Sequence, residues 1–256
     1  SGCRGIKRAV SHEPLTMGAF FHTILYVPIF NLLVFLYDVL PGGDIGFAII
    51  SLTVLIKLIL WPFMSKSLRS QKAMQELQPK IEELKAKHGA DREALAKAMM
   101  ELYQKEKVNP LASCLPLLVQ LPILIALYQV LLGGFGAETL MQLYPFVHNP
   151  GSINHIFLGV IDLSVASLYL AVLAGYFQFM QTRMLISKRP PKQVAGKKGA
   201  LDETMLASMN KSMLMFMPAI TVIIGATLPA GLTLYWVTVN IVSILQQQFV
   251  FSKIRG

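Results

Sequence analysis

One lysine lies inside a stretch that is otherwise apolar enough to span a bilayer. Lys57 is the only charged residue between Gly46 and Phe63. A charged side chain near mid-membrane costs about 2.5–3.5 kcal/mol on insertion scales, so it normally faces a bundle interior or a water-filled cavity. Thr53 lies four residues earlier and therefore shares a helix face with Lys57. The spacing predicts a polar, cationic site between helices.

The alternative is that Lys57 snorkels, with its stem on apolar neighbours and its ammonium at the membrane surface. Ser65 begins the polar segment that follows, and it is eight residues further on, or about 12 Å of helix. Because this distance is long for a lysine stem, we favour the inward orientation.

Other polar or amphipathic side chains interrupt the remaining apolar stretches. Each has an ordinary explanation, because glutamines link transmembrane helices by hydrogen bonds and Tyr or Trp anchors helix ends at the interface. Together with a buried cation, they indicate a hydrated groove that is open to the cytoplasm and closed outside. The predicted groove residues, besides Lys57 and Thr53, are Gln120, Gln178, Gln181, Tyr235, Trp236 and Asn240.

The sequence patterns of enzymes and of nucleotide- or metal-binding proteins are absent. There is no GxSxG, HExxH or Walker loop, and no GxGxxG followed by an acidic residue. Cys3 and Cys114 form neither a CxxC pair nor a metal-ligand spacing. No carboxylate lies within the five spans predicted below, so a carboxylate proton relay is not expected there. We therefore predict no enzyme activity, no cofactor and no metal site.

Composition and the placement of charge point to a polytopic membrane protein. Of the 256 residues, 54% are hydrophobic, which is high for a soluble domain. No Lys or Arg occurs in residues 9–56, 108–182 or 212–252. Basic residues that cluster outside apolar segments are typical of cytoplasmic loops. The net charge of +9 therefore reflects topology, and we expect no recognition of a specific nucleic-acid sequence.

Five apolar segments are long enough to span a membrane, and the basic segments between them alternate consistently with the C-terminus inside. The fold class that follows is an all-α polytopic membrane protein with a five-helix transmembrane core, located in the inner or plasma membrane. The predicted spans are residues 45–64, 109–132, 165–182, 212–228 and 231–249, with residues 133–164 outside and residues 65–107, 183–211 and 250–256 in the cytoplasm.

Residues 65–107 carry ten Lys and Arg against seven Asp and Glu. Apolar residues recur at helical spacing on both sides of His88-Gly89-Ala90, and Asp91 can cap a second helix. We predict a cytoplasmic helical hairpin whose two apolar stripes pack on each other.

Residues 1–44 are compatible with two topologies. Residues 17–40 are apolar and long enough to span, and three basic residues before them favour an inside N-terminus. Pro28 and the polar face shared by Asn31 and Asp38 favour a helix that lies in the outer interface. We predict the interfacial helix, with residues 1–44 outside.

The first residues, Ser1-Gly2-Cys3, have the small-residue pattern that precedes the lipid-bearing cysteine of a lipoprotein signal. Cys3 is therefore a candidate for lipidation. A cloning scar or chance explains the pattern about as well.

Several motifs occur in a specific order and spacing. They are Leu55-Ile-Lys57-Leu-Ile-Leu-Trp-Pro62, Leu77-Gln-Pro-Lys-Ile81, Val108-Asn-Pro-Leu-Ala-Ser-Cys-Leu-Pro-Leu-Leu-Val-Gln-Leu-Pro122, Leu228-Pro-Ala-Gly-Leu-Thr-Leu-Tyr-Trp236, Asn240 and Gln246-Gln-Gln248. Together they resemble the YidC family of membrane protein insertases, from about Ile29 to Phe251.

The resemblance implies five core helices around a groove open to cytoplasm and lipid, together with the cytoplasmic hairpin. The chain resembles the compact form of the family, which lacks a large extracytoplasmic domain. In this form an interfacial helix lies near residues 20–40, and some members are lipoproteins. The family's groove cation matches Lys57, where arginine is more frequent, and lysine keeps the charge but loses the guanidinium fork. Thr53, Gln120 and the Tyr235-Trp236 pair match further groove positions.

The activity that this resemblance implies is insertion and folding of nascent membrane proteins, alone or with the Sec translocon. The implied partners are those clients, the lipid bilayer, the translocon and the ribosome. A small anion transporter with Lys57 as counter-ion is the alternative, but it would show inverted repeats and matching broken helices, which we do not find. An intramembrane enzyme would need a nucleophile and a base in the spans.

Overall fold

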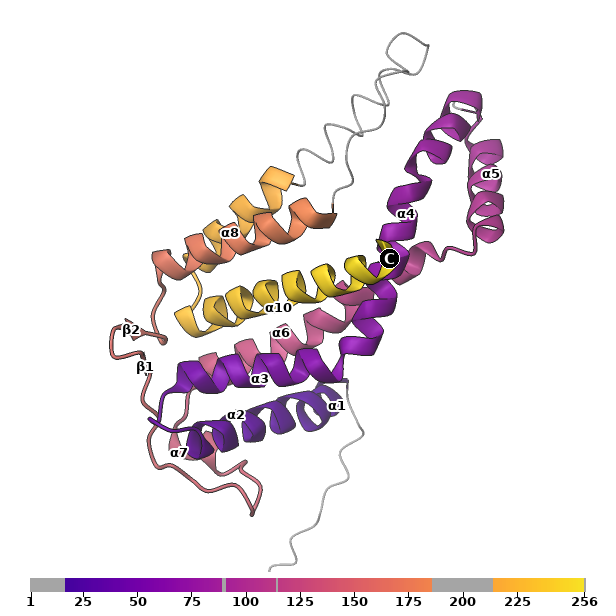
Figure 1. Cartoon of the computed structure of the whole chain (residues 1–256). Helices are drawn as coiled ribbons and strands as arrows, with labels where there is room; N and C mark the ends of the chain where they lie inside the picture. The colour runs from indigo at the N-terminus through magenta and orange to yellow at the C-terminus, as the bar shows by residue number, and fades with distance from the viewer. Residues whose placement is uncertain (1–16, 89–90, 114, 186–213, 256) are drawn as a thin grey trace, which may run out of the picture.

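The computed structural model describes residues 17–88, 91–113, 115–185 and 214–255. Long helices lie side by side, and α10 packs against α8, α3 and α6 (Figure 1). One two-helix arm projects from one end of this body. The elements are α1 Met17–Phe21, η1 His22–Tyr26, α2 Val27–Val39, α3 Ile45–Ile59, α4 Trp61–His88, α5 Arg92–Lys105, η2 Pro110–Ser113, α6 Leu115–Gly133, α7 Ala137–Leu140, β1 Ile156–Phe157, β2 Ile161–Asp162, α8 Leu168–Leu185, a helix over Leu214–Gly225, and α10 Ala230–Arg255.

The segment expected as one helix over residues 45–64 is divided at Leu60. There α3 ends and α4 begins, and the two axes are bent by 68°. Pro62 lies in the first turn of α4, where its missing N–H leaves no hydrogen bond unmade, whereas it would break a continuous helix. The bend directs α4 away from the body and into the projecting arm.

The projecting arm is the helical hairpin expected over residues 65–107. Asp91 caps α5, because its Oδ1 accepts hydrogen bonds from Glu93 N at 3.0 Å and Ala94 N at 3.1 Å. Lys80 of α4 lies 2.5 Å from Glu106 just after α5, and this hydrogen bond holds the pKa of the Glu106 carboxyl below its usual value. This ion pair ties α4 to the end of α5.

At the end opposite the hairpin, the segment between α6 and α8 ties the helices together. β1 and β2 pair antiparallel, and Asp44 joins them to α3 by accepting from Gly46 N and Leu158 N, both at 2.8 Å. Ala166 forms a bridge with Pro229 at the start of α10. These contacts hold the far ends of α3, α8 and α10 in place.

The helix formed by Gly18–Val39 packs against α3 and α6. The segment after α6 covers it, because Asn31 donates to Gln142 O at 3.1 Å and accepts from Tyr144 N at 2.6 Å. Phe30 is fully buried and stacks with Phe135 at a centroid distance of 6.2 Å. The interfacial placement expected for residues 17–40 stays a prediction, and its test closes the Discussion.

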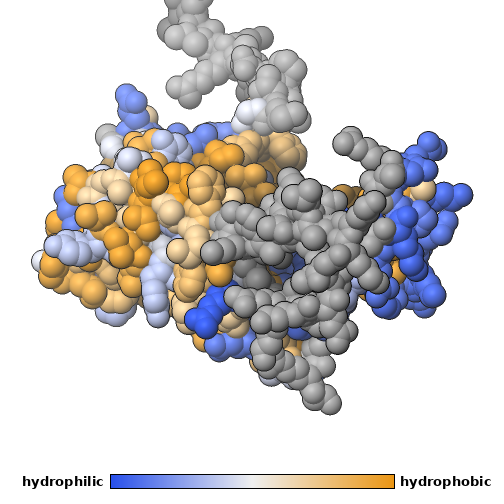
Figure 2. Space-filling model, turned by 90° about the horizontal axis from the view of Figure 1, so that it is seen from above, coloured by the Kyte–Doolittle hydropathy of each residue, from blue (hydrophilic) through white to orange (hydrophobic). Residues whose placement is uncertain are grey.

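Among the described helices, Gly18–Val39 and Leu115–Gly133 are each long and apolar enough to cross a membrane, and the bent α3–α4 pair makes a third if it is one span. The other predicted spans coincide with α8, the Leu214–Gly225 helix and α10, whose crossing stays a prediction. In Figure 2 apolar residues cover much of the helical body, and hydrophilic ones cover the hairpin. An apolar surface of this extent has to be shielded from water, and the lipid of a membrane would shield it.

Candidate functional site

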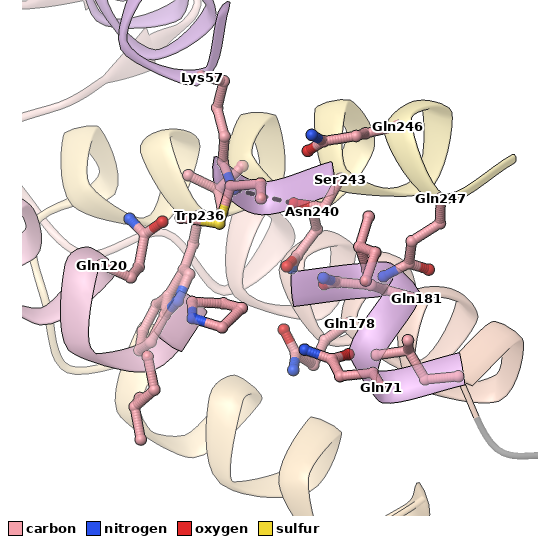
Figure 3. A pocket seen from close by; sticks show the side chains of 16 residues that line it. Lys57, Gln71, Gln120, Gln178, Gln181, Trp236, Asn240, Ser243, Gln246 and Gln247 are labelled. Atoms are coloured by element: carbon pink, nitrogen blue, oxygen red, sulfur yellow. Dashed lines mark hydrogen bonds between the residues drawn. The ribbon is translucent and has the colours of Figure 1, made fainter. Parts of the chain in front are cut away.

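A cavity of about 300 Å³ lies between α3, α4, α6, α8 and α10 (Figure 3). It is the place where polar residues from five separate helices meet. The lining residues are Lys57, Met64, Leu68, Gln71, Pro116, Leu117, Gln120, Gln178, Gln181, Leu185, Trp236, Val239, Asn240, Ser243, Gln246 and Gln247.

Lys57 contributes the only charge among these residues. Its side chain is 7% exposed, and its Nζ donates a hydrogen bond to Ser243 Oγ at 3.0 Å. This bond joins α3 to α10 and holds the ammonium between the helices. This geometry has the inward orientation expected from the sequence, with the ammonium directed to α10.

Most of the other predicted groove residues come together around Lys57. Gln120 of α6, Gln178 and Gln181 of α8, and Trp236 and Asn240 of α10 all line the cavity. Asn240 is also tied to α8, because its Nδ2 donates to Ala174 O at 3.3 Å.

Two predicted groove residues do not line the cavity. Thr53 is buried, and its hydroxyl donates to Ile49 O at 2.6 Å within α3, so its polar group is satisfied by its own helix. Tyr235 is also buried, and Gln120 Nε2 donates to its hydroxyl. Sharing a helix face with Lys57 therefore did not place Thr53 on the cavity, and Tyr235 supports Gln120 from behind.

Four polar lining residues were not predicted as groove residues: Gln71, Ser243, Gln246 and Gln247. The spacing on α10 contains the missing signal, because Trp236, Asn240, Ser243 and Gln247 recur every three or four residues and so share one helix face. Gln71 belongs to α4, which was assigned to the hairpin, but the first turns of α4 still pack against α10 and α6 and line the cavity before the helix extends into the arm.

Gln246 and Gln247 are adjacent but differ in their partners. Gln246 Nε2 donates to Trp61 O at 3.1 Å and to Ser65 Oγ at 3.2 Å, which braces the first turn of α4 after the bend. Gln247 is 1% exposed, and within the described residues its Oε1 has no hydrogen-bond partner.

The described residues hold no group of three or more His, Cys, Asp or Glu side chains that could bind a metal ion. Cys3, the candidate for lipidation, lies outside the described residues. The amides and Lys57 that line the cavity can bind and orient polar groups, and the ammonium can attract a negative charge.

Comparisons with known proteins agree with this geometry. The family profile of the 60Kd inner membrane protein matches residues 35–255. The chain belongs to this family.

Its relatives include proteins named "Membrane protein insertase YidC". The one from Magnetococcus marinus is 39% identical over 212 residues, covering 82% of this chain and 33% of the relative. The one from Anaeromyxobacter sp. is 42% identical over 210 residues, covering 81% of this chain and 33% of the relative. The one from Shewanella halifaxensis is 37% identical over 235 residues, covering 90% of this chain and 37% of the relative. The chain thus spans about a third of the length of the curated relatives it matches.

A solved structure, described as an active YidC insertase with its first transmembrane domain resolved, has the same fold. The TM-score is 0.55 at 24% sequence identity, and the match covers 88% of this chain and 46% of that one. The family membership and this likeness establish a mostly helical membrane protein of the YidC type.

Proposed function

We propose that this chain inserts nascent membrane proteins and helps them to fold. The observation that carries the proposal is a buried lysine in a polar cavity between helices whose outer faces are apolar. The names printed for the relatives support the same activity. A client helix must move a short polar tail across the membrane, and a polar cavity lowers the cost of taking that tail out of water.

The positive charge of Lys57 acts on the tail. An ammonium in a low-dielectric site attracts an acidic group more strongly than it would in water, so an acidic tail is held most firmly. The client's apolar helix then leaves sideways into lipid, driven by burial of its apolar surface. No nucleotide or metal takes part.

The proposed orientation places the hairpin and the C-terminus in the cytoplasm, in agreement with the basic residues there. The tail then enters from the hairpin side, and the contacts of Asp44 and the Ala166–Pro229 bridge close the outer side. We extend the proposal to the Sec translocon and the ribosome as partners on the family resemblance alone, and the exposed hairpin is the surface we assign to them.

The test is insertion of a single-span client with an acidic tail into vesicles that contain only this purified protein. We expect protease protection of the tail in these vesicles and none in protein-free vesicles. Measuring anion flux through the same vesicles addresses the transporter alternative. Rapid flux without client insertion would refute the proposed activity.

A further inference from the structure

The cavity lining is rich in side-chain amides. Of the 16 lining residues, seven carry a carboxamide and one, Lys57, is charged. The amides come from four helices, so they surround the space rather than forming one strip. In Figure 3, Gln71 and Gln178 lie together on the side of the cavity away from Lys57.

A carboxamide has the same hydrogen-bonding groups as a peptide unit, namely N–H donors and a carbonyl acceptor. An ammonium only donates. A lining that both donates and accepts is therefore matched to the N–H and C=O groups of an extended polypeptide, whatever its side chains are. Each backbone group left without a partner in a membrane costs several kcal/mol, and every polar tail meets this cost whether or not it is charged.

The amides differ in how far the fold already uses them. Gln246 and Asn240 donate to main-chain oxygens of the protein itself, and Gln120 donates to Tyr235. Gln247 is different, because its Oε1 is buried and has no hydrogen-bond partner among the described residues. A buried acceptor without a partner is unfavourable, and although Oε1 itself is covered, Gln247 lines the cavity, so rotation of its terminal amide brings the oxygen to a bound donor.

We propose that the cavity binds the main chain of the client's polar tail through its carboxamides, and that Gln247 Oε1 accepts a hydrogen bond from a tail peptide N–H. This inference rests on the proposed insertase function and adds what the cavity recognises. Lys57 then adds a preference for acidic tails to a general affinity for polypeptide backbone, so neutral polar tails are clients too.

The experiment compares two synthetic single-span clients with the same apolar segment. One has a neutral tail of glycine and serine, and the other has the same tail with each glycine N-methylated, which removes the N–H donors. In protein-free vesicles the N-methylated tail crosses at least as fast, because it has fewer donors to desolvate. The full chain in vesicles should reverse this order and insert the unmethylated tail several-fold faster.

Three adjacent glutamines provide matched variants. Gln247→Met keeps the length of the side chain but has no acceptor oxygen, so it should slow the unmethylated tail several-fold and narrow the difference between tails. Gln248 is exposed and does not line the cavity, so Gln248→Met should behave as the wild-type protein. Gln178→Met, on α8, should narrow the difference between the insertion rates of the two tails as Gln247→Met does. Thermal unfolding of each purified variant shows whether it is folded.

Equal insertion rates for the two tails in the wild-type protein would overturn the backbone-binding proposal. So would an unchanged ratio of the two rates in both Gln247→Met and Gln178→Met, if these variants are folded. A client with an acidic tail separates this failure from failure of the proposed function. If the acidic tail still inserts and Lys57→Ala lowers its insertion, the insertase activity stands without backbone recognition. If no client inserts, both proposals fail.

Discussion

At the scale of single residues, Lys57 combines burial with one well-placed partner. Its Nζ donates to Ser243 Oγ at 3.0 Å, which leaves further N–H donors for a client. An ammonium is a compact charge on a flexible stem, whereas a guanidinium is planar and donates in a fixed fork. We therefore propose that this position requires a positive charge more than a particular donor geometry.

We expect Lys57→Arg to retain insertion of a client with an acidic tail, and Lys57→Ala to lower it roughly tenfold, which corresponds to about 1.4 kcal/mol. The loss follows from removing the one charge that attracts the tail. The measurement is the initial rate of tail protection in vesicles, with a neutral-tail client as the control. Undiminished insertion of the acidic tail by Lys57→Ala would rule out this role.

Gly46 shows how closely two elements meet at the outer end of α3. A Cβ built at this position would lie 2.1 Å from Phe157 Cδ2 of β1. We expect Gly46→Ala to destabilise the protein by about 1–3 kcal/mol, as overpacked sites do. Gly136 has no heavy atom within 4 Å of a Cβ, so Gly136→Ala is the control. Thermal unfolding in detergent measures both, and equal midpoints would show that Phe157 moves aside freely.

At the scale of elements, the bend at Leu60 joins the cavity to the hairpin. Gln246 donates to Trp61 O and Ser65 Oγ, and Trp61 meets Phe249 edge-on at a centroid distance of 5.8 Å. Lys72 lies over the Phe251 ring at 5.7 Å. The base of α4 therefore belongs to the packed body through α10, and the rest of the hairpin extends beyond it.

This division predicts that the outer hairpin serves clients or partners rather than the stability of the body. Deleting residues 73–102 with a short linker keeps Lys72 and the α10 contacts, so the unfolding midpoint in detergent should hold while client insertion falls. The hairpin has few fully buried apolar residues and many exposed charges, which is typical of regions with low local stability. A collapse of the midpoint would assign the hairpin to the core instead.

The elements also show what the sequence could and could not predict. Apolar periodicity and charge placement predicted the helical hairpin, and polarity within apolar segments predicted six of the 16 residues that line the cavity. The break at Leu60 was missed, because Pro62 is compatible with both a kinked helix and a new first turn. Thr53 does not line the cavity, because helix spacing fixes a face but not whether a short side chain reaches past its neighbours.

At the scale of the whole molecule, the helical body has two distinct ends. The end with β1 and β2 and the end with the hairpin lie on opposite sides of the helical body (Figure 1). Asp38, at the end of α2, is 3.3 Å from His148 in the segment after α6. This contact puts the end of α2 on the side proposed to be outside, whichever way the helix runs before it.

The last prediction concerns where the chain before that helix lies. Two arguments compete, because Gly18–Val39 is long and apolar enough to cross, whereas Asn31, Tyr37 and Asp38 all contact the segment after α6, as expected of a helix lying along the outer surface. We expect the second arrangement. Ser11→Cys, in a Cys3→Ser and Cys114→Ser background, should then react with a membrane-impermeant thiol reagent applied to intact cells.

Lys97→Cys in the same background is the control, because Lys97 is exposed on α5 and the hairpin is proposed to be cytoplasmic. It should react only after the membrane is broken. If Ser11→Cys behaves in the same way as Lys97→Cys, then Gly18–Val39 crosses the membrane and the chain has one span more than the five predicted. The labelling pattern thus decides the N-terminal topology without depending on whether the protein inserts any client.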